Sequence, residues 1–359
     1  MTSLDIPHRR LLNQHIAAAP FEKPAEVVSW LVAVQSQDYA GAKWSLGLRL
    51  RHDTHDTDVD RAFNEGSILR THVMRPTWHF VTPADIRWLL ALTSPRVHAA
   101  NATMYRRLEL DSASLKRSHK ALTKALRGGR QLTRDELRGV LEMAGIAAKS
   151  GQRLAYIVMH AELDGLICSG PRRGKQFTYA LLEERVPATR TLIPAEALIE
   201  LAQRYFVGRG PATVQDFAKW SGLTIADARR GLEAVKDQLQ RETLNGEEYW
   251  LAPWVASTPA ASPSAYLLSV YDEYISSYKD RSAINDAEVG LKLFTMGAAL
   301  SYIVVVDGQI VGTWRRTLNK DTVSIQIDYL SRVTKAQRRA VAVAAQRYGE
   351  FLEKRVVIA

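Results

Sequence analysis

The amino-acid sequence predicts an α+β fold in which tandem winged-helix (helix-turn-helix) units precede a small C-terminal domain that resembles a β-barrel. Helical stretches followed by two short extended segments occur three times before residue 256, and this order is the outline of a winged helix. A segment rich in Pro, Ser and Ala at 257–264 is typical of a linker, and strand-like segments follow it. We therefore expect four domains, at 1–94, 95–190, 191–256 and 265–359.

In the first unit we expect a β-hairpin with Arg75 and Pro76 at its turn, preceded by three helices. The helices are expected at 6–18, 25–35 and 59–65, and the strands at 68–74 and 77–82.

The second unit repeats this outline. Thr133 and Glu136 have the spacing of a capping box, which places the start of a helix at Thr133. The turn at 170–175 between its two strands contains Arg172 and Arg173, and such a basic turn is suited to phosphate contact. Helices are also expected at 115–126 and 152–163.

The third unit is expected to end in a hairpin whose turn is Asn245 and Gly246, the strongest short hairpin signal in a sequence. Its helices are expected at 195–206 and 226–236. In the C-terminal domain a second tight turn, Asp307 and Gly308, joins two strands. The strands of that domain are expected at 265–271, 301–306, 309–315 and 322–327, and its closing helix at 335–352.

Charge and composition favour a nucleic-acid partner. The chain has 48 Lys and Arg against 38 Asp and Glu, a formal charge of +10 that attracts polyanions. These cations are spread along the chain, which favours nucleic acid over a membrane. No run of eighteen apolar residues or signal peptide is present, so we expect a cytoplasmic, nucleoid-associated monomer. Cys168 is the only cysteine, which excludes disulfides and thiolate metal clusters; we expect it to be a small buried residue.

Several segments, which together span nearly the whole chain, resemble the AlkZ-like DNA glycosylase family. They read VQSQDYA at 34–40, LRTHVMRPTWH at 69–79, GPAT at 210–213, DFAKWSGL at 216–223, YDEY at 271–274, YKDR at 278–281 and VGTWRR at 311–316. Ser276 and Ser277 stand where that family often has Gly. The resemblance implies winged-helix enzymes of bacteria that remove alkylated bases and unhook some interstrand crosslinks, with Gln35 and Gln37 as the Gln-x-Gln site.

The chemistry of two glutamines fits that role. A purine alkylated at N7 or N3 carries a positive charge and leaves without an acid, so the enzyme need only place a water and stabilise an oxocarbenium-like sugar. A Gln amide can orient one water, although it does not titrate. Residues two apart on a helix point away from each other, so Gln35 and Gln37 converge only if the helix ends at Ala33 or Val34. Gly41 is a candidate for its left-handed cap.

Other polar residues have two interpretations each. Asp38 is either a carboxylate that helps to stabilise positive charge or a solvated helix end, and we favour the second slightly. His72 and His79 need not share a face, so a structural or phosphate-contacting role is favoured over metal or acid-base chemistry. His52 and His55 lie among four aspartates, and we favour a polar loop over a divalent-ion site. We expect the tryptophans to be core residues: Trp78, Trp88, Trp220, Trp250, Trp254 and Trp314.

The predicted activity is that of a monofunctional, metal-independent DNA glycosylase acting on N7-alkylguanine-type purines in double-stranded DNA, without a cofactor. The Asp307–Gly308 hairpin is expected to project towards the DNA. A non-enzymatic winged-helix regulator is the main alternative, and a protein that sequesters an alkylating metabolite is a third. The residues predicted to contact DNA are Arg70, Arg75, His79, Arg172, Arg173, Arg315 and Arg316.

Overall fold

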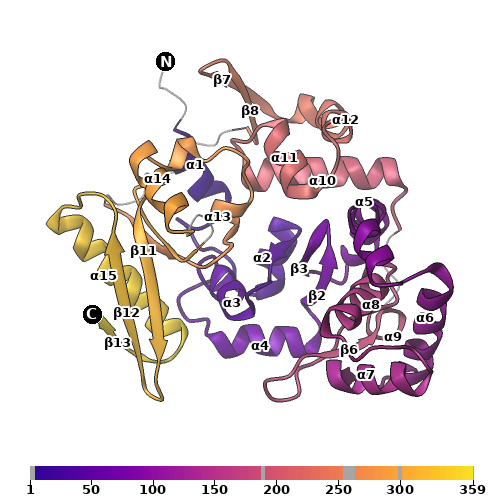
Figure 1. Cartoon of the computed structure of the whole chain (residues 1–359). Coiled ribbons are helices and arrows are strands. Elements are labelled where there is room, and N and C mark those ends of the chain that lie inside the picture. Colours follow the sequence, from indigo (N-terminus) through magenta and orange to yellow (C-terminus); the bar gives the residue numbers. More distant parts are fainter. Residues whose placement is uncertain (1–4, 187–190, 254–262, 298–300, 359) are drawn as a thin grey trace. The chain divides into compact units, whose positions relative to one another are not determined.

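The structure is a computed structural model that describes residues 5–186, 191–253, 263–297 and 301–358 (Figure 1). Trp254 and residues 257–262 of the expected linker lie outside this described part. The α-helices are α1 (Ile6–Asn13), α2 (Pro24–Leu31), α3 (Tyr39–Gly47), α4 (Asp56–Glu65), α5 (Ile86–Arg107), α6 (Ser112–Leu126), α7 (Arg134–Met143), α8 (Gly151–Leu163), α9 (Leu182–Arg185), α10 (Pro194–Arg209), α11 (Val214–Ser221), α12 (Ile225–Val235), α13 (Glu273–Ser276), α14 (Ala287–Thr295) and α15 (Lys335–Phe351). Two 3₁₀ helices, η1 (Lys236–Gln238) and η2 (Ser282–Ile284), complete the helical elements of the described residues.

The strands are short except in the C-terminal part of the chain. They are β1 (Val34–Gln35), β2 (Leu69–Val73), β3 (Arg75–Val81), β4 (Leu132–Thr133), β5 (Ile167–Ser169), β6 (Thr178–Leu181), β7 (Gln240–Leu244), β8 (Glu247–Leu251), β9 (Ala265–Leu268), β10 (Ile303–Val306), β11 (Gln309–Leu318), β12 (Thr322–Tyr329) and β13 (Arg355–Ile358). Helices and sheets together confirm the α+β class.

The chain divides into two compact units. Unit 1 combines residues 1–59, 199–220 and 224–359, and unit 2 combines 60–198 with 221–223. Unit 1 is therefore assembled from three stretches that are far apart in the sequence. The expected boundary at residue 94 falls inside α5, a helix that continues through Pro95.

Unit 1 is built on a five-stranded sheet with the order β13-β12-β11-β10-β9. All pairs are antiparallel except β12 with β13, and this sheet fits the C-terminal β domain that the sequence predicts. α3 packs on it through Trp44, whose ring lies 4.9 Å from that of Tyr348 in α15 and whose Nε1 donates to the Leu267 carbonyl at 2.6 Å. Trp314 is also fully buried and donates to the Leu268 carbonyl.

Unit 2 contains the three-stranded sheet β4-β6-β5 beside α6, α7 and α8. The predicted capping box is present, because Glu136 accepts from the Thr133 N–H and Thr133 accepts from the Glu136 N–H. Leu122, Leu137 and Leu154 lie in the apolar core between these helices. The element order in this segment is α6, β4, α7, α8, β5, β6.

Most expected helices agree with the structure to within three residues, and two are too long. The turn expected at Arg75 and Pro76 is wrong, because both residues lie in β3 and the chain turns at Met74, whose φ is positive. Asn245 and Gly246 have positive φ angles and join β7 to β8, which confirms that hairpin. The helix expected at 6–18 ends at Asn13, and the one expected at 25–35 ends at Leu31. The sequence did not predict α3 or α5. In α3 seven of nine residues are buried, so it lacks the one-sided apolar pattern that marks a surface helix.

Candidate functional site

The two predicted catalytic glutamines lie in a short connection between two helices of unit 1. α2 ends at Leu31 and α3 begins at Tyr39. Gln35 ends β1 and is half-buried, whereas Gln37 is exposed. Because α2 ends at Leu31 and not at Gln35, the condition for the two amides to converge is met, and the helical geometry that would turn them apart is absent.

A strained turn, not a glycine, ends α2. Val32 has φ 63° and ψ −51°, and the Ala33 N–H donates to the Leu31 carbonyl at 2.6 Å, which is a γ-turn of the rare positive-φ type. Gly41 is inside α3, so its predicted role as a cap is wrong. A β-branched residue with positive φ is an outlier, and such strain gathers at functional sites.

Buried Glu273 and Arg209 hold the backbone on both sides of this turn. Glu273 Oε1 accepts from the Gln35 N–H at 3.0 Å, and Arg209 donates to the Ala33 carbonyl at 3.0 Å. Arg209 and Glu273 also pair with each other at 2.9 Å with both side chains fully buried. The Trp220 ring nitrogen donates to the same carboxylate at 3.0 Å. The path of the chain into Gln35 is therefore fixed by an ion pair.

Glu273 remains an anion inside the protein. Burial alone would raise the pKa of its carboxyl, but the positive charge of Arg209, the Gln35 N–H and the Ser277 hydroxyl lower that pKa to about 2. Its two oxygens accept four hydrogen bonds, from the Gln35 N–H, Arg209, Trp220 and Ser277. A carboxylate with this pKa and these partners is a poor proton acceptor, so Glu273 is a positioning residue.

A second buried ion pair lies next to the first. Arg49 donates to both oxygens of Asp272 at 3.0 Å, and both side chains are fully buried. Arg49 also donates to Gln14 Oε1, the Gln14 amide donates to the Tyr278 hydroxyl, and that hydroxyl donates to the Arg209 carbonyl. The network joins α1, α3, α10 and α13 around the Gln35 loop.

Asp38 acts as a helix cap. Its Oδ1 accepts the Gly41 N–H at 2.6 Å at the start of α3, which agrees with the favoured interpretation of a helix end. Asp38 also hydrogen-bonds the Tyr302 hydroxyl, and Arg316 contacts the same hydroxyl. The Arg316 guanidinium lies 4.9 Å from the Tyr302 ring centre, so a half-buried cation lies in this cluster.

The Asp307–Gly308 turn does not project as expected. A side chain on Gly308 would lie 2.5 Å from Pro7, and Tyr274 donates to the Gly308 carbonyl at 2.9 Å. The turn is closed in by α1 and α13. The prediction of a free strand tip there is wrong, because pattern alone could not show which segments cover the turn.

The neighbouring hairpin of β11 and β12 has an exposed tip instead. Figure 1 shows it extending beyond the other strands of the sheet. Leu318 near its turn is 52% exposed, and Lys320 in the turn is exposed. Arg315 on β11 is also exposed and pairs with Asp328 on β12 at 2.9 Å.

In unit 2, Arg70 lies between two aromatic rings. Its guanidinium is 4.3 Å from the Trp78 ring centre and 4.6 Å from that of Phe177. These three residues line a pocket of about 290 Å³ together with Arg134 and Lys175. The pocket is therefore basic and aromatic, a combination that suits nucleic acid.

Arg75 and His79 contact each other on β3. The Arg75 guanidinium lies 3.1 Å from His79 Nε2, and His79 Nδ1 lies 3.0 Å from the Thr77 carbonyl. His79 is fully buried, whereas Arg75 is half-buried. Because DNA cannot reach a fully buried ring, His79 is placed to support Arg75 and not to touch phosphate itself in this conformation.

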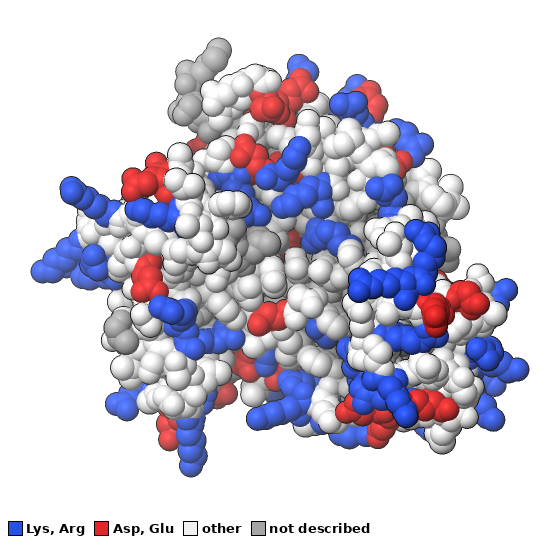
Figure 2. All heavy atoms as spheres, in the orientation of Figure 1, with Lys and Arg blue, Asp and Glu red and all other residues white. Residues whose placement is uncertain are grey.

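The basic turn at 170–175 has one half-buried and one exposed arginine. Arg172 pairs with Asp60 at 3.4 Å, and Arg173 pairs with Glu136 at 2.7 Å. On the face that Figure 2 shows, Lys and Arg side chains are spread across the surface, with acidic groups between them, and do not gather in one patch.

His72 and Cys168 have structural surroundings. His72 is buried and hydrogen-bonded to Glu162, and the register of β2 and β3 places it and His79 on opposite faces. Cys168 is fully buried, as expected, and burial raises the pKa of its thiol to about 12.

The aspartate-rich segment near His52 behaves as a polar loop and helix start. His55 Nδ1 lies 3.2 Å from the Glu350 carbonyl, and Asp56 pairs with Lys43 at 2.6 Å. Within the described residues, the ligand atoms of this segment form no group of three. No helix in the described part of the chain combines the length and apolarity needed to cross a membrane.

The comparisons with known proteins identify the class of the protein, a DNA glycosylase, and its family. The family model described as DNA glycosylase AlkZ-like matches residues 28–351, so the chain belongs to the AlkZ-like DNA glycosylase family. A curated relative from Streptomyces sahachiroi, named interstrand DNA cross-link repair glycosylase, is 25% identical over 323 residues, with 85% of each chain covered. The solved structure of Streptomyces sahachiroi DNA glycosylase AlkZ has a TM-score of 0.74 at 21% identity, with 97% of this chain and 99% of that chain covered.

Sequence reasoning missed the residues that hold the Gln35 loop. Glu273 lies in the YDEY segment that carried the resemblance, and its side chain is fully buried. Arg209, at the end of α10, is one of 48 Lys and Arg residues, and its neighbours in the sequence do not distinguish it from the others. A usable signal was the acidic pair Asp272–Glu273 between apolar residues, because adjacent buried carboxylates require buried cations.

Proposed function

We propose that the protein is a monofunctional glycosylase that hydrolyses the N-glycosidic bond of cationic alkylated purines, such as N7-alkylguanine, in duplex DNA. The observation that carries the proposal is the Gln35–Gln37 loop, whose backbone is held by Glu273 and Arg209. A catalytic amide must be held within a fraction of an ångström to orient a water, and a buried ion pair beneath the loop provides that rigidity.

In this mechanism the positive charge on the base replaces acid catalysis. The C1′–N bond breaks with both electrons going to the base, which leaves as a neutral purine, and an oxocarbenium-like sugar develops. The amides of Gln35 and Gln37 orient a water towards C1′, and this water loses a proton to solvent after the bond forms. The leaving group needs no Lewis acid, so we propose that the hydrolytic step is metal-independent.

Crosslinked bases are the second part of the proposed substrate class. The curated relative is named for interstrand crosslink repair, and an N7-linked crosslink has the same cationic leaving group as an N7-methylated base. An exposed Gln37 supports a shallow site that accepts a bulky adduct. We therefore propose that crosslinks are unhooked by the same chemistry.

For DNA binding, we propose that residues 112–181 form a winged helix. The order α6, β4, α7, α8, β5, β6 and the sheet order β4-β6-β5 support this assignment. We keep the division into three such units and a C-terminal domain as a hypothesis. The proposed backbone contacts are Arg75, Arg172, Arg173, Arg315 and Arg316. Arg70 is only 7% exposed, so we propose that it contacts DNA through the pocket that it lines.

Excision of 7-methylguanine from a duplex is the experiment that tests the proposed function. Alkali should convert each abasic site into a strand break after incubation with the protein, and unmodified guanine should not be released. If no alkylated base is released from any duplex, the proposed activity is wrong and the non-enzymatic regulator is the better interpretation.

Duplex binding should weaken steeply as salt rises, because several phosphates are neutralised at once. Replacing exposed Arg173 or Arg315 with alanine should lower affinity and reduce the slope of log K against log salt by about one each. Fluorescence anisotropy over a salt series measures both quantities. Arg51, an exposed arginine that we do not assign to DNA contact, provides the control variant. Salt-independent binding, or strong preference for one sequence, would contradict a backbone clamp.

The tip of the β11–β12 hairpin should contribute to binding, since an exposed leucine beside a lysine is suited to a groove. We expect L318S/K320A to reduce duplex affinity a few-fold without changing the unfolding midpoint. The matched control is D307A, in the neighbouring turn, which should alter stability more than affinity because Asp307 accepts the Ser264 N–H at 2.8 Å. Equal affinities for the parent and L318S/K320A would remove the hairpin from the binding surface.

A further inference from the structure

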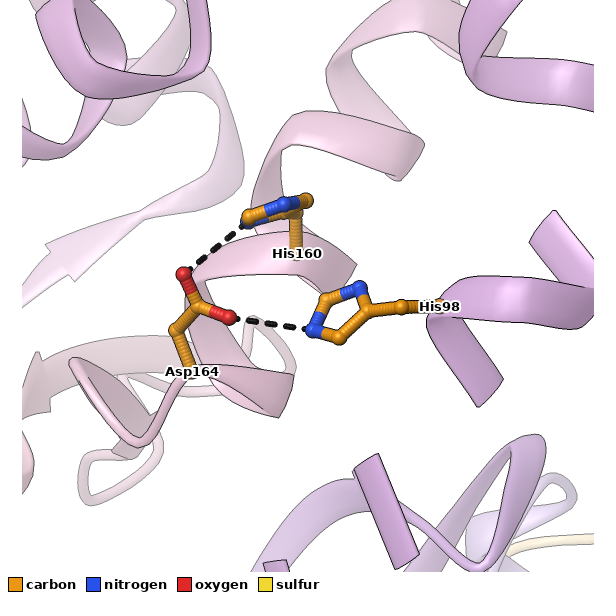
Figure 3. Close-up of side chains that lie close together, drawn as sticks. All are labelled: His98, His160 and Asp164. Carbon is orange, nitrogen blue, oxygen red and sulfur yellow. Dashed lines mark hydrogen bonds and ion pairs between the residues drawn. The ribbon is translucent and has the colours of Figure 1, made fainter. Parts of the chain in front are cut away.

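Unit 2 contains a cluster of three histidines and an aspartate that the proposed chemistry does not use. His98 is on α5, His119 on α6 and His160 on α8, and Asp164 follows as the residue that caps the end of α8. His98 Nε2 lies 3.0 Å from one oxygen of Asp164, and His160 Nδ1 lies 3.3 Å from the other. Figure 3 shows both imidazoles turned towards the carboxylate.

His119 completes the group. Its Nε2 lies 3.2 Å from His160 Nδ1, and its Nδ1 lies 3.7 Å from Asp164. The rings of His98 and His160 are 4.5 Å apart, and those of His119 and His160 are 5.1 Å apart. The helices thus bring together imidazoles from positions 98, 119 and 160.

We propose that this cluster is a binding site for a divalent transition-metal ion of the Zn²⁺ class, with His98, His160 and Asp164 as its protein ligands and His119 beside them. The ligand atoms of His98, His160 and Asp164 all lie within 4.8 Å of one another. Tetrahedral Zn²⁺ with bonds of about 2.0–2.1 Å separates its ligand atoms by about 3.3 Å. His98 and His160 lie 3.0 and 3.3 Å from the two different oxygens of Asp164, so a bound ion would draw one oxygen and the two nitrogens closer together.

The donor set selects the class of ion. Imidazole nitrogens suit Zn²⁺ and its transition-metal neighbours, whereas Mg²⁺ and Ca²⁺ require mainly oxygen ligands. Binding of such an ion requires neutral imidazoles and a charged carboxylate, so the affinity should fall at low pH.

Two further features support ligand binding. The Tyr105 hydroxyl lies 3.0 Å from His98 Nδ1, and a hydrogen bond at that second ring nitrogen orients a ligating imidazole. His98 and Asp164 also line a pocket of about 390 Å³, which gives an ion a path from solvent. A bound ion would connect α5 and α8, so its expected role is to stabilise unit 2.

The test uses the full chain without a polyhistidine tag, stripped of metal with a chelator. Co²⁺ is the spectroscopic probe, because tetrahedral Co²⁺ absorbs strongly in the visible range, and Zn²⁺ affinity is then measured by displacement. We expect one ion per chain, and a rise in the unfolding midpoint when Zn²⁺ is added. D164N and H98N should abolish the Co²⁺ spectrum and the Zn²⁺-dependent rise.

Two further variants test the orienting hydrogen bond and provide a control. Y105F keeps all proposed ligands and should lower Zn²⁺ affinity by about ten- to a hundredfold, as loss of an orienting hydrogen bond does. H52N removes an exposed histidine of unit 1 and should bind like the parent. Circular dichroism of the metal-free proteins checks that each variant is folded.

A parent protein with no tetrahedral Co²⁺ spectrum would overturn the proposal, even if a variant fails to fold. Equal Zn²⁺ affinities for the parent, D164N and H98N would overturn it as well. The site is independent of the proposed hydrolysis. Well below the unfolding midpoint, chelator should therefore lower thermal stability and leave 7-methylguanine excision unchanged.

Discussion

Replacing Gln35 or Gln37 with alanine should slow excision of 7-methylguanine from duplex DNA by roughly ten- to a thousand-fold and leave duplex affinity nearly unchanged. An amide that orients the attacking water acts mainly in the transition state, so its loss affects the chemical step. Single-turnover excision, read as alkali-labile breaks, measures the rate, and anisotropy measures affinity.

The control for this prediction is Q346A, because Gln346 is an exposed glutamine on α15 with no assigned role in hydrolysis or DNA binding. Its excision rate should equal that of the parent. Undamaged guanine should remain in the duplex with every variant, since a carboxamide cannot protonate a poor leaving group. Parent-like excision by both Q35A and Q37A would show that the site assignment is wrong.

Removing one partner of the buried Arg209–Glu273 pair should cost about 3–5 kcal/mol of folding free energy, because the remaining charge is left buried without compensation. R209M and E273Q should both shift the urea midpoint strongly. The double variant R209M/E273Q should be less destabilised than the sum of the two single changes, because no unpaired charge remains. R315A, which breaks an exposed pair with Asp328, should cost no more than about 1 kcal/mol.

The same pair gives a dependence on pH. The folded pKa of Glu273, about 2, is below its ordinary value of 4.5. Its contribution is therefore fully present above pH 4.5 and is lost as pH falls towards 2. E273Q should flatten the acid side of the stability profile. Additive effects of the two single variants, or an unchanged acid limb, would contradict a stabilising ion pair at this place.

Much of the fold followed from local sequence signals. The Thr133–Glu136 capping box and the Asn245–Gly246 turn involve residues three apart or adjacent, so short-range hydrogen bonding and backbone preference determine them. The long helix α5 was missed because Pro95 lies inside it. α3 was missed because it is buried nearly all round and has no polar face to reveal its period.

The candidate site also depends partly on local sequence and partly on tertiary packing. The sequence by itself determined the chemistry on offer: two amides in one short segment, a positive charge suited to DNA, and a resemblance that the family match supports. Only the tertiary structure decided how that segment is held. Glu273 is 238 residues from Gln35 and 64 from Arg209, and no periodicity or propensity acts over such separations.

The sequence likewise could not show which of two turns in the C-terminal sheet is covered and which is exposed. The tight Asp307–Gly308 turn was correctly located in the sequence, but Pro7 and Tyr274 cover it, and the β11–β12 tip is the exposed one. The His98, His119 and His160 cluster likewise exists only because three helices pack together. Burial and convergence depend on which distant segments exclude water from a group, and that choice is made by the packing of the whole chain.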